Sequence, residues 1–248
     1  MLFMVKKWLG LCVCVSAVLA WLIVAPACSS LQFGPTEPTK EDELAQYWLT
    51  ISLYAGPFYD DLGLTLIDYR PFSVIDDVKT PDGHIIRPPK EVKIIPAGTL
   101  IKLVKISYPD EKNIFKRPIY WPKNNILVYV KVAKDRGLVS LFREETHVMI
   151  LPASLSEEAQ VKTYLSRFFS TKDPNLWILQ TESYIQDGIF TKTPKIGMRK
   201  EQVIASLGPA QKKQYQAEND FEPAQEIWRY HDYLIVFVDN KVNKITRI

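Results

Sequence analysis

The sequence contains little cysteine and little histidine, with three residues of each in a chain of 248. Cys12 and Cys14 lie inside an apolar N-terminal stretch, so Cys28 is the only cysteine left once this stretch is removed. A single cysteine forms no intramolecular disulfide bond. A G-x-S-x-G elbow, a phosphate-binding glycine loop and an H-E-x-x-H pair are also missing. These absences predict a protein that is not an enzyme and that needs no cofactor.

The sequence also lacks an excess of charge of either sign. It has 31 basic and 28 acidic side chains, and Lys6 and Lys7 are basic residues that precede the apolar stretch. The rest of the chain is therefore almost neutral, which gives no electrostatic basis for binding nucleic acid. A hydrophobic content of 47% with 24% charged residues is typical of a globular protein.

The N-terminus has the layout of a secretory signal peptide. Lys6 and Lys7 are followed by the apolar run Trp8–Val24 and then by the small residues Ala25, Pro26 and Ala27. The run is slightly long for a signal peptide and short for a membrane-spanning helix of about 20 residues. Residues 1–27 are therefore predicted to be a cleaved signal peptide, and an uncleaved membrane anchor is the alternative.

Ala25-Pro26-Ala27-Cys28 resembles the bacterial lipoprotein box, although alanine stands at its first position, where leucine is usual. The resemblance implies cleavage before Cys28 and acylation of this cysteine, with palmitate among the chains. Two or more acyl chains give stable membrane anchoring. Ser29 follows, where the family's inner-membrane retention signal has aspartate, so the implied location is the outer membrane, on its periplasmic face. Residues 28–43 are rich in proline and polar side chains and are predicted to form a tether.

Residues 44–152 are predicted to form a β-rich domain, because short apolar or alternating runs are separated by proline, glycine and aspartate. The expected strands are 62–69, 92–95, 100–106, 126–132, 138–142 and 147–151. Ile95–Gly98 fits a type I turn with proline second and glycine fourth. Val128, Val130 and Val132 share one face, which predicts a half-buried strand. The stretches PAGTLIKLVKI, residues 96–106, and NILVYVKV, residues 125–132, together loosely resemble an SH3-like module. A rolled sheet is the other expected form of this domain.

Residues 153–190 are predicted to be a helical connector. Ser154 and Glu157 have capping-box spacing and precede an apolar stripe formed by Val161, Tyr164, Leu165 and Phe168. Asp173-Pro174 marks a second helix start, with Gly188 as its expected end. The pattern over residues 175–187 also fits a strand.

Residues 191–248 contain a predicted helix over 200–207 that Gly208-Pro209 ends. The polar stretch Gln211–Pro223 is expected to be a loop before three strands, 227–230, 233–238 and 241–247. His231-Asp232 and Asp239-Asn240 are two-residue hairpin connections. Val242 and Ile245 are three residues apart, so a regular strand would place these two apolar side chains on opposite faces. This predicts a bulge or an early end in the last strand.

This last region resembles the SmpA/OmlA or BamE-like family of outer-membrane lipoproteins, which belong to the barrel-assembly machinery. The matching residues are Gly197, Met198, Glu201, Gln202, Val203, Leu207, Gly208, Pro209, Trp228, Tyr230, Val236, Phe237 and Val242. Two departures are Arg199 at the usual threonine or serine cap, and Pro209 directly after Gly208. The resemblance implies a small αβββ domain, so the expected fold class is α+β.

The candidates for chemistry are few. His147 lies near Glu144 and Glu145, but no second histidine is close in sequence, so no metal site is expected. The acid pairs Asp60-Asp61 and Asp76-Asp77 are expected to face water. His84 stands alone, and His231 fits a hairpin turn.

The segment KRPIYWPK, residues 116–123, is the most suggestive for binding. Tyr120 and Trp121 are framed by prolines and by basic residues, among them Arg117 and Lys123. Aromatic side chains beside cations are common in binding sites. Either these aromatics project from a loop to bind a glycan, peptide or protein, or Trp121 closes the end of the barrel.

Taken as a whole, the sequence predicts a non-enzymatic lipoprotein that acts as a scaffold for an envelope protein, and outer-membrane protein assembly is the role that the BamE-like family implies. Lys212, Lys213 and Arg229 are its expected partner contacts in the C-terminal region. The alternative is an SH3-like lipoprotein that binds peptidoglycan through Tyr120 and Trp121. A degenerate or novel envelope hydrolase is a third hypothesis.

Overall fold

The computed structural model describes residues 45–59, 61–132, 145–218 and 223–248 as a mixed α+β fold in which strands predominate. This confirms the predicted α+β class. The predicted signal peptide, Cys28, the tether and the expected strand 138–142 lie outside the described residues. None of the helices in these ranges has both the length and the apolar character that crossing a bilayer requires.

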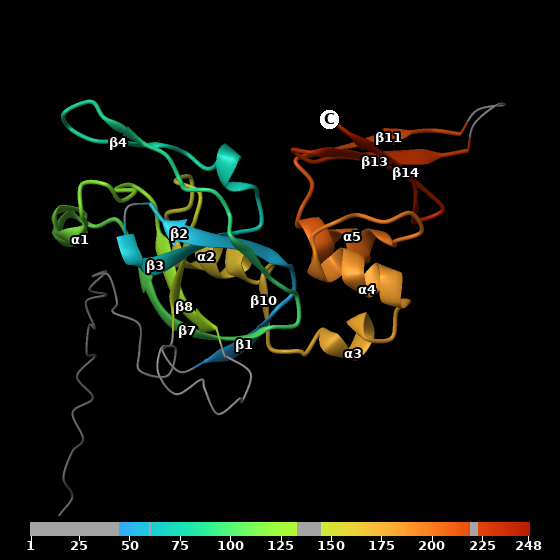
Figure 1. The fold of residues 1–248 in the computed structure, drawn as a ribbon, viewed down its shortest axis with the longest axis horizontal. Helices are drawn as coiled ribbons and strands as arrows, with labels where there is room; N and C mark the ends of the chain where they lie inside the picture. The colour runs from blue at the N-terminus through green and yellow to red at the C-terminus, as the bar shows by residue number, and fades with distance from the viewer. Residues whose placement is uncertain (1–44, 60, 133–144, 219–222) are drawn as a thin grey trace, which may run out of the picture. The chain divides into compact units, whose positions relative to one another are not determined.

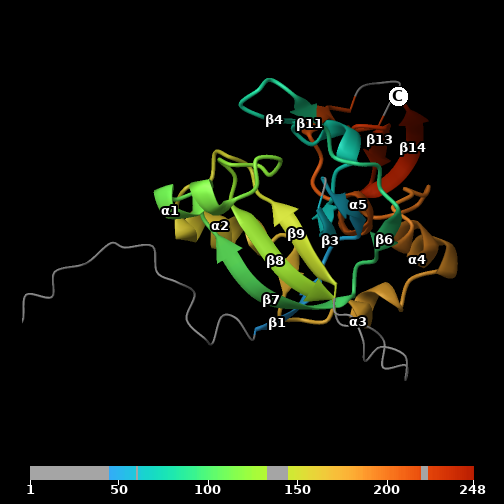
Figure 2. The same ribbon diagram turned by 60° about the vertical axis from the view of Figure 1, so that its left-hand side comes forward.

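Eight strands form the N-terminal sheet, in the order β10-β1-β7-β8-β9-β3-β2-β6. Their bounds are β1 Gln46–Leu49, β2 Leu53–Phe58, β3 Asp61–Asp68, β6 Lys93–Ile95, β7 Leu100–Ser107, β8 Leu127–Val132, β9 Thr146–Ile150 and β10 Phe169–Ser170. All neighbours are antiparallel except β3 and β9. Figure 2 shows β7, β8 and β9 side by side. The strands β1 and β2 were not among the predicted ones.

The sheet bends back on itself, because strands that lie far apart in the sheet order follow one another directly in the chain. β1 leads into β2, and β6 leads into β7 through Pro96–Thr99. Leu49 N donates to Thr99 O at 2.9 Å, and Gly98 N donates to Leu49 O at 2.7 Å. The predicted turn is wrong by one residue: Thr99 N bonds to Pro96 O, which makes Gly98 the third residue, with φ +84°. Glycine is favoured there because a side chain strains the left-handed backbone.

Strand β8 is buried on both faces, so the predicted half-buried strand is wrong. Val128 and Val130 lie in a core with Leu49, Ile101 and other apolar residues, whereas Leu127 and Tyr129 lie in a second cluster. The second face is covered by residues 72–86, which include a 3-10 helix, Phe72–Val74, and the two-stranded sheet β4 (Val78–Lys79) and β5 (Ile85–Ile86).

Helix α2, Glu158–Leu165, begins later than expected. Glu157 occupies the N-cap and forms a capping box with Gln160, so the predicted pair of Ser154 and Glu157 is wrong. The predicted apolar stripe is confirmed, because Val161 and Leu165 are buried in the first core with Phe168 after the helix.

The single helix predicted from Asp173-Pro174 to Gly188 is two helices, α3 (Asn175–Ile178) and α4 (Ser183–Phe190). Pro174 and not Asp173 occupies the N-cap of α3, although Asp173 Oδ1 accepts from Asn175 N at 2.8 Å just before the helix. Gly188 ends neither helix. A Cβ on it would lie 2.6 Å from Thr193 O and 2.5 Å from Met198 Cε, so its role is to let other segments approach α4 closely.

The C-terminal sheet is an antiparallel meander in the order β11-β12-β13-β14. Its strands are β11 Lys212–Gln216, β12 Gln225–Arg229, β13 Tyr233–Val238 and β14 Lys241–Arg247. Helix α5, Lys200–Leu207, has the predicted bounds and packs Val203 and Leu207 with Trp228 and Phe237. Figure 1 shows α4 and α5 along one face of this sheet.

Two features of this meander confirm local predictions, and one corrects a prediction. Asp239 and Asn240 both have positive φ in the β13–β14 hairpin, and the register shifts where Val236 pairs with Lys244 and Phe237 with Val242, which is the predicted bulge. The polar stretch 211–223 is not only a loop, because β11 adds a fourth strand there.

A buried polar cluster connects the two sheets. Lys192 Nζ donates to Ser52 O at 2.7 Å and to Ser206 O at 2.9 Å, and its side chain is 3% exposed. Ser52 Oγ donates to Ile189 O, and Ser206 Oγ donates to Gly188 O. The cluster therefore fixes α4 and α5 against the bend between β1 and β2.

Candidate functional site: a cavity beside Trp121

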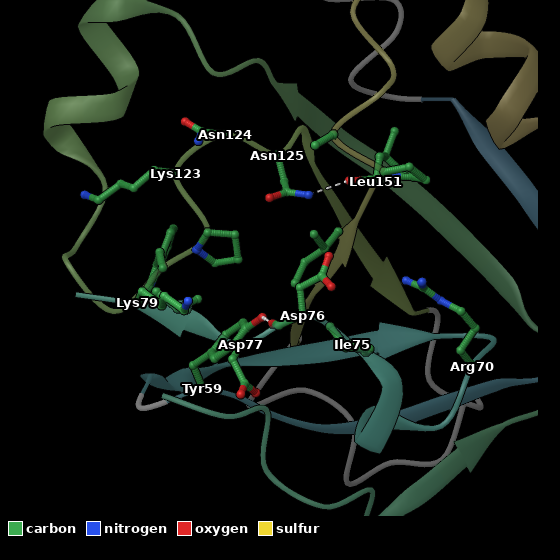
Figure 3. Close-up of a pocket in the computed structure, with 16 residues that line it drawn as sticks. Tyr59, Arg70, Ile75, Asp76, Asp77, Lys79, Lys123, Asn124, Asn125 and Leu151 are labelled. Carbon is green, nitrogen blue, oxygen red and sulfur yellow. Dashed lines mark hydrogen bonds between the residues drawn. The ribbon is translucent and has the colours of Figure 1, made fainter. Parts of the chain in front are cut away.

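A cavity beside Trp121 has a volume of about 340 Å³. This lies at the small end of the range for ligand sites, roughly 300 to 1,000 Å³. Three segments supply most of its lining: residues 75–79, residues 121–125 and residues 150–153. In Figure 3, Tyr59, Asp76, Asp77 and Lys79 lie on one side and Lys123, Asn124 and Asn125 lie across the cavity.

Trp121 is both a packing residue and a wall of this cavity. Its ring meets Phe58 edge-to-face, with centroids 5.1 Å apart and an interplanar angle of 85°. It is partly exposed, and its indole Nε1 is buried without a hydrogen-bond partner among the residues that the structure describes. An unpaired buried donor costs about 1 to 3 kcal/mol, which a ligand acceptor would recover once the ring turns this donor toward the cavity.

Arg117 and Lys123 hold the loop that carries Trp121. Arg117 is 6% exposed, and its Nη1 donates to the carbonyls of Pro122 (2.9 Å), Lys123 (3.0 Å) and Asn125 (2.7 Å). Burial lowers the pKa of Arg117. Lys123 Nζ donates to the carbonyls of Ile114 and Arg117. The preceding helix, α1, spans Glu111–Lys116. Arg117 is thus directed into the protein, whereas Lys123 also borders the cavity.

The facing wall is acidic and exposed. Asp76, Asp77 and Lys79 all reach solvent, and Asp77 lies 3.5 Å from Arg87 Nε. Tyr59 OH donates to Asp76 O at 3.0 Å. Burial, followed by the charge of Asp76, raises the pKa of Tyr59, so its hydroxyl stays a neutral donor.

Amide groups complete the lining. Asn125 Nδ2 donates to Leu151 O at 2.9 Å, as the dashed line in Figure 3 shows, and Asn124 is exposed. The cavity is therefore lined by residues with carboxylate, amide, ammonium and guanidinium groups and by two aromatic residues, Tyr59 and Trp121. Such groups bind a polar ligand with many hydroxyls through hydrogen bonds and ring stacking.

The other predicted site residues lie elsewhere. Tyr120 is partly exposed and does not line the cavity. Lys212 and Arg229 are directly opposite each other on β11 and β12, and Lys213 Nζ lies 3.9 Å from the centroid of the Trp228 ring. The structure thus pairs Lys212 with Arg229 on one face of the sheet and places Lys213 on the other face, over Trp228. None of the three lines the cavity beside Trp121.

The histidines occupy separate positions. His147 is 3% exposed on β9, with Nδ1 3.0 Å from Glu145 O, whereas His84 lies beside Asp82 and His231 beside Gln211. Within the described ranges, no three histidine, cysteine or acidic side chains are grouped as a metal site would require.

Sequence reasoning missed the contribution of residues 75–79 and the burial of Lys192. The acid pair at Asp76-Asp77 was visible, but nothing local brings it to Trp121, which is 44 residues away in the chain. Lys192 stands in the polar run TKTPK, which is typical of an exposed loop.

Comparison with protein-family models, characterised proteins and solved structures gives no match. Function therefore has to be inferred from the chemistry of the sites themselves.

Proposed function

We propose that this chain is a non-enzymatic, lipid-anchored binding protein of the bacterial envelope, and that its N-terminal, SH3-like or rolled-sheet domain binds a cell-wall glycan. The anchor is supported by the lipoprotein-like box at Cys28, and Ser29 supports the outer membrane. The observation that carries the glycan assignment is the unpaired indole N–H of Trp121 at a polar cavity. For a sugar hydroxyl to accept from this donor, the Trp121 side chain has to turn so that its buried Nε1 reaches the cavity, while the other hydroxyls meet Asp76 and Asn124.

The experiment is retention of the purified mature protein on peptidoglycan sacculi. Trp121→Phe keeps an aromatic ring against Phe58 and removes the donor together with part of the indole, so binding should weaken by at least about fivefold, which corresponds to the loss of about 1 kcal/mol. Asp76→Asn should also weaken it. Trp177→Phe, which changes a tryptophan outside the cavity, is the matched control. Wild-type binding by both cavity variants, or no retention of the unaltered protein, would refute the assignment.

The C-terminal region is proposed to be a BamE-like helix-on-meander domain with β11 as an added strand. The support is that most of the apolar residues matched to the family share one core, whereas Val236 is partly exposed outside it. The core residues are Met198, Val203, Leu207, Trp228, Tyr230, Phe237 and Val242. Gly197 and Gly208 have positive φ, at +86° and +90°, which explains glycine at both positions.

Scaffolding of an envelope protein is the second candidate function, and one pair of residues favours it. Lys212 and Arg229 are both exposed and directly opposed across two strands, and like charges in that arrangement are destabilising. An acidic partner would relieve the repulsion. If Lys212→Glu and Arg229→Glu release a co-purifying envelope protein while sacculus binding does not depend on Trp121, the scaffold assignment replaces the glycan one.

A further inference from the structure

Five large apolar side chains are exposed on α3, α4 and the segment that follows. They are called the α3–α4 patch here and are Leu176, Trp177, Leu179, Tyr184 and Ile196. Leu176 is 71% exposed and Leu179 is 61% exposed. Tyr184 OH lies 3.2 Å from the Cβ position of Gly197, so Tyr184 lies beside the residue that follows Ile196. Several large apolar side chains exposed on two consecutive short helices mark a candidate interaction surface.

The patch is held in place by the fold. Ile178 is fully buried in the C-terminal core, so the leucines at 176 and 179 are displayed on the outer side of this short helix. Asn175 Nδ2 donates to Gly98 O at 2.9 Å, and Gln186 Nε2 donates to Thr181 O at 2.8 Å. The first bond fixes the start of α3 and the second fixes the connection to α4.

The composition of the patch suits the boundary of a lipid bilayer. Two leucines provide purely apolar surface, and tryptophan and tyrosine have an apolar body with a polar group, which favours the interface between water and lipid. Lys172, just before α3, is exposed and can face lipid phosphates. A surface of this kind adds membrane affinity in proportion to the apolar area that it buries.

The position of the patch in the chain also favours the membrane. Gly98 bonds to both Asn175 and Leu49, so α3 is held next to β1, through which the chain enters the described fold. Cys28 precedes Gln46 by 18 residues, which reach at most about 60 Å when fully extended. A lipid at Cys28 would thus keep the patch within reach of the bilayer at high effective concentration.

We propose that the α3–α4 patch is a second membrane contact, which inserts Leu176 and Leu179 into the bilayer interface beside the lipid-anchored N-terminus. The inference rests on the proposed anchor. Anchor and patch together orient the protein, because a tether alone leaves the attached fold free to rotate.

The test is tryptophan fluorescence of the mature protein in vesicles of phosphatidylethanolamine and phosphatidylglycerol with brominated acyl chains. Emission from Trp177 should be quenched, so Trp177→Phe should lose the quenching that the unaltered protein shows. Leu176→Gln with Leu179→Gln should reduce quenching by about threefold or more, because the buried apolar area is removed. Val92→Gln, at a position that is also 71% exposed, should leave it unchanged.

Equal quenching of the unaltered protein and Trp177→Phe would overturn the inference. So would a dimer in sedimentation that the double leucine variant dissociates, because the patch would then be covered by a second copy. The mass of the mature N-terminus tests the anchor separately. If Cys28 is unmodified, quenching by vesicles added in excess still decides whether the patch binds lipid.

Discussion

At the scale of single residues, Lys192 is the most unusual group in the described chain. Its ammonium is enclosed by two carbonyl oxygens, and it lies 4.7 Å from the centroid of the Tyr54 ring. Burial lowers the pKa of Lys192 to about 7, and the negative charge of Asp68 opposes this shift only in part. The protein thus holds an ionisable group where its two sheets meet, at a position where burial makes the charged form costly.

This pKa predicts how stability depends on pH. Between pH 7 and about 10 the unfolded chain holds a proton that folded Lys192 has released, so stability should rise with pH, by about 2 kcal/mol from pH 7 to pH 9. Burial raises the pKa of Tyr54 to about 12, which reverses the trend only above pH 10.

Chemical denaturation at a series of pH values measures this slope. Lys192→Met, which has no titratable group, should flatten it, while Lys172→Met at an exposed position should keep it. An unaltered slope in Lys192→Met would show that other groups cause the dependence.

At the scale of elements, the sequence predicted a helix, turn or strand correctly where the residues that determine it lie within one short segment. Helix α5, the Asp239-Asn240 hairpin and the bulge in β14 were predicted because capping, turn residues and strand parity all act over a few residues. The break between α3 and α4, the added strand β11 and the double-sided burial of β8 were not predictable in this way. Each depends on a partner segment that is distant in sequence: Gly98 for α3, β12 for β11 and residues 72–86 for β8.

Substitution of Gly188 distinguishes two effects on the stability of α4, the helix propensity of the residue and its packing against distant segments. Helix propensity alone predicts that Gly188→Ala stabilises the protein by up to about 1 kcal/mol. The close approach of Thr193 O and Met198 predicts the opposite, a loss of roughly 1 to 3 kcal/mol from overpacking. Thermal unfolding distinguishes the two signs. Gly63→Ala, where the only close atom is the flexible Asp61 carboxylate, should change stability little, and a stabilised Gly188→Ala would contradict the packing account.

At the scale of the whole molecule, the candidate site shows what sequence reasoning found and what it missed. Trp121 was identified as a binding or packing residue because aromatic, proline and basic residues occur together, and its surroundings support both roles. The opposite wall was missed, because Tyr59 and residues 75–79 reach the cavity only through the fold of the N-terminal sheet. The same fold turns Arg117 inward, where its guanidinium donates hydrogen bonds to backbone carbonyls.

The central claim is that Trp121 presents its indole N–H to a glycan, and the most direct measurement is the indole region of the ¹H–¹⁵N spectrum during titration with soluble muropeptides. The Trp121 signal is identified by its loss in Trp121→Phe. The account predicts that this signal shifts downfield in a saturable manner, while the indole signal of buried Trp228 stays in place. An unchanged Trp121 signal at muropeptide concentrations that saturate any other response would contradict it.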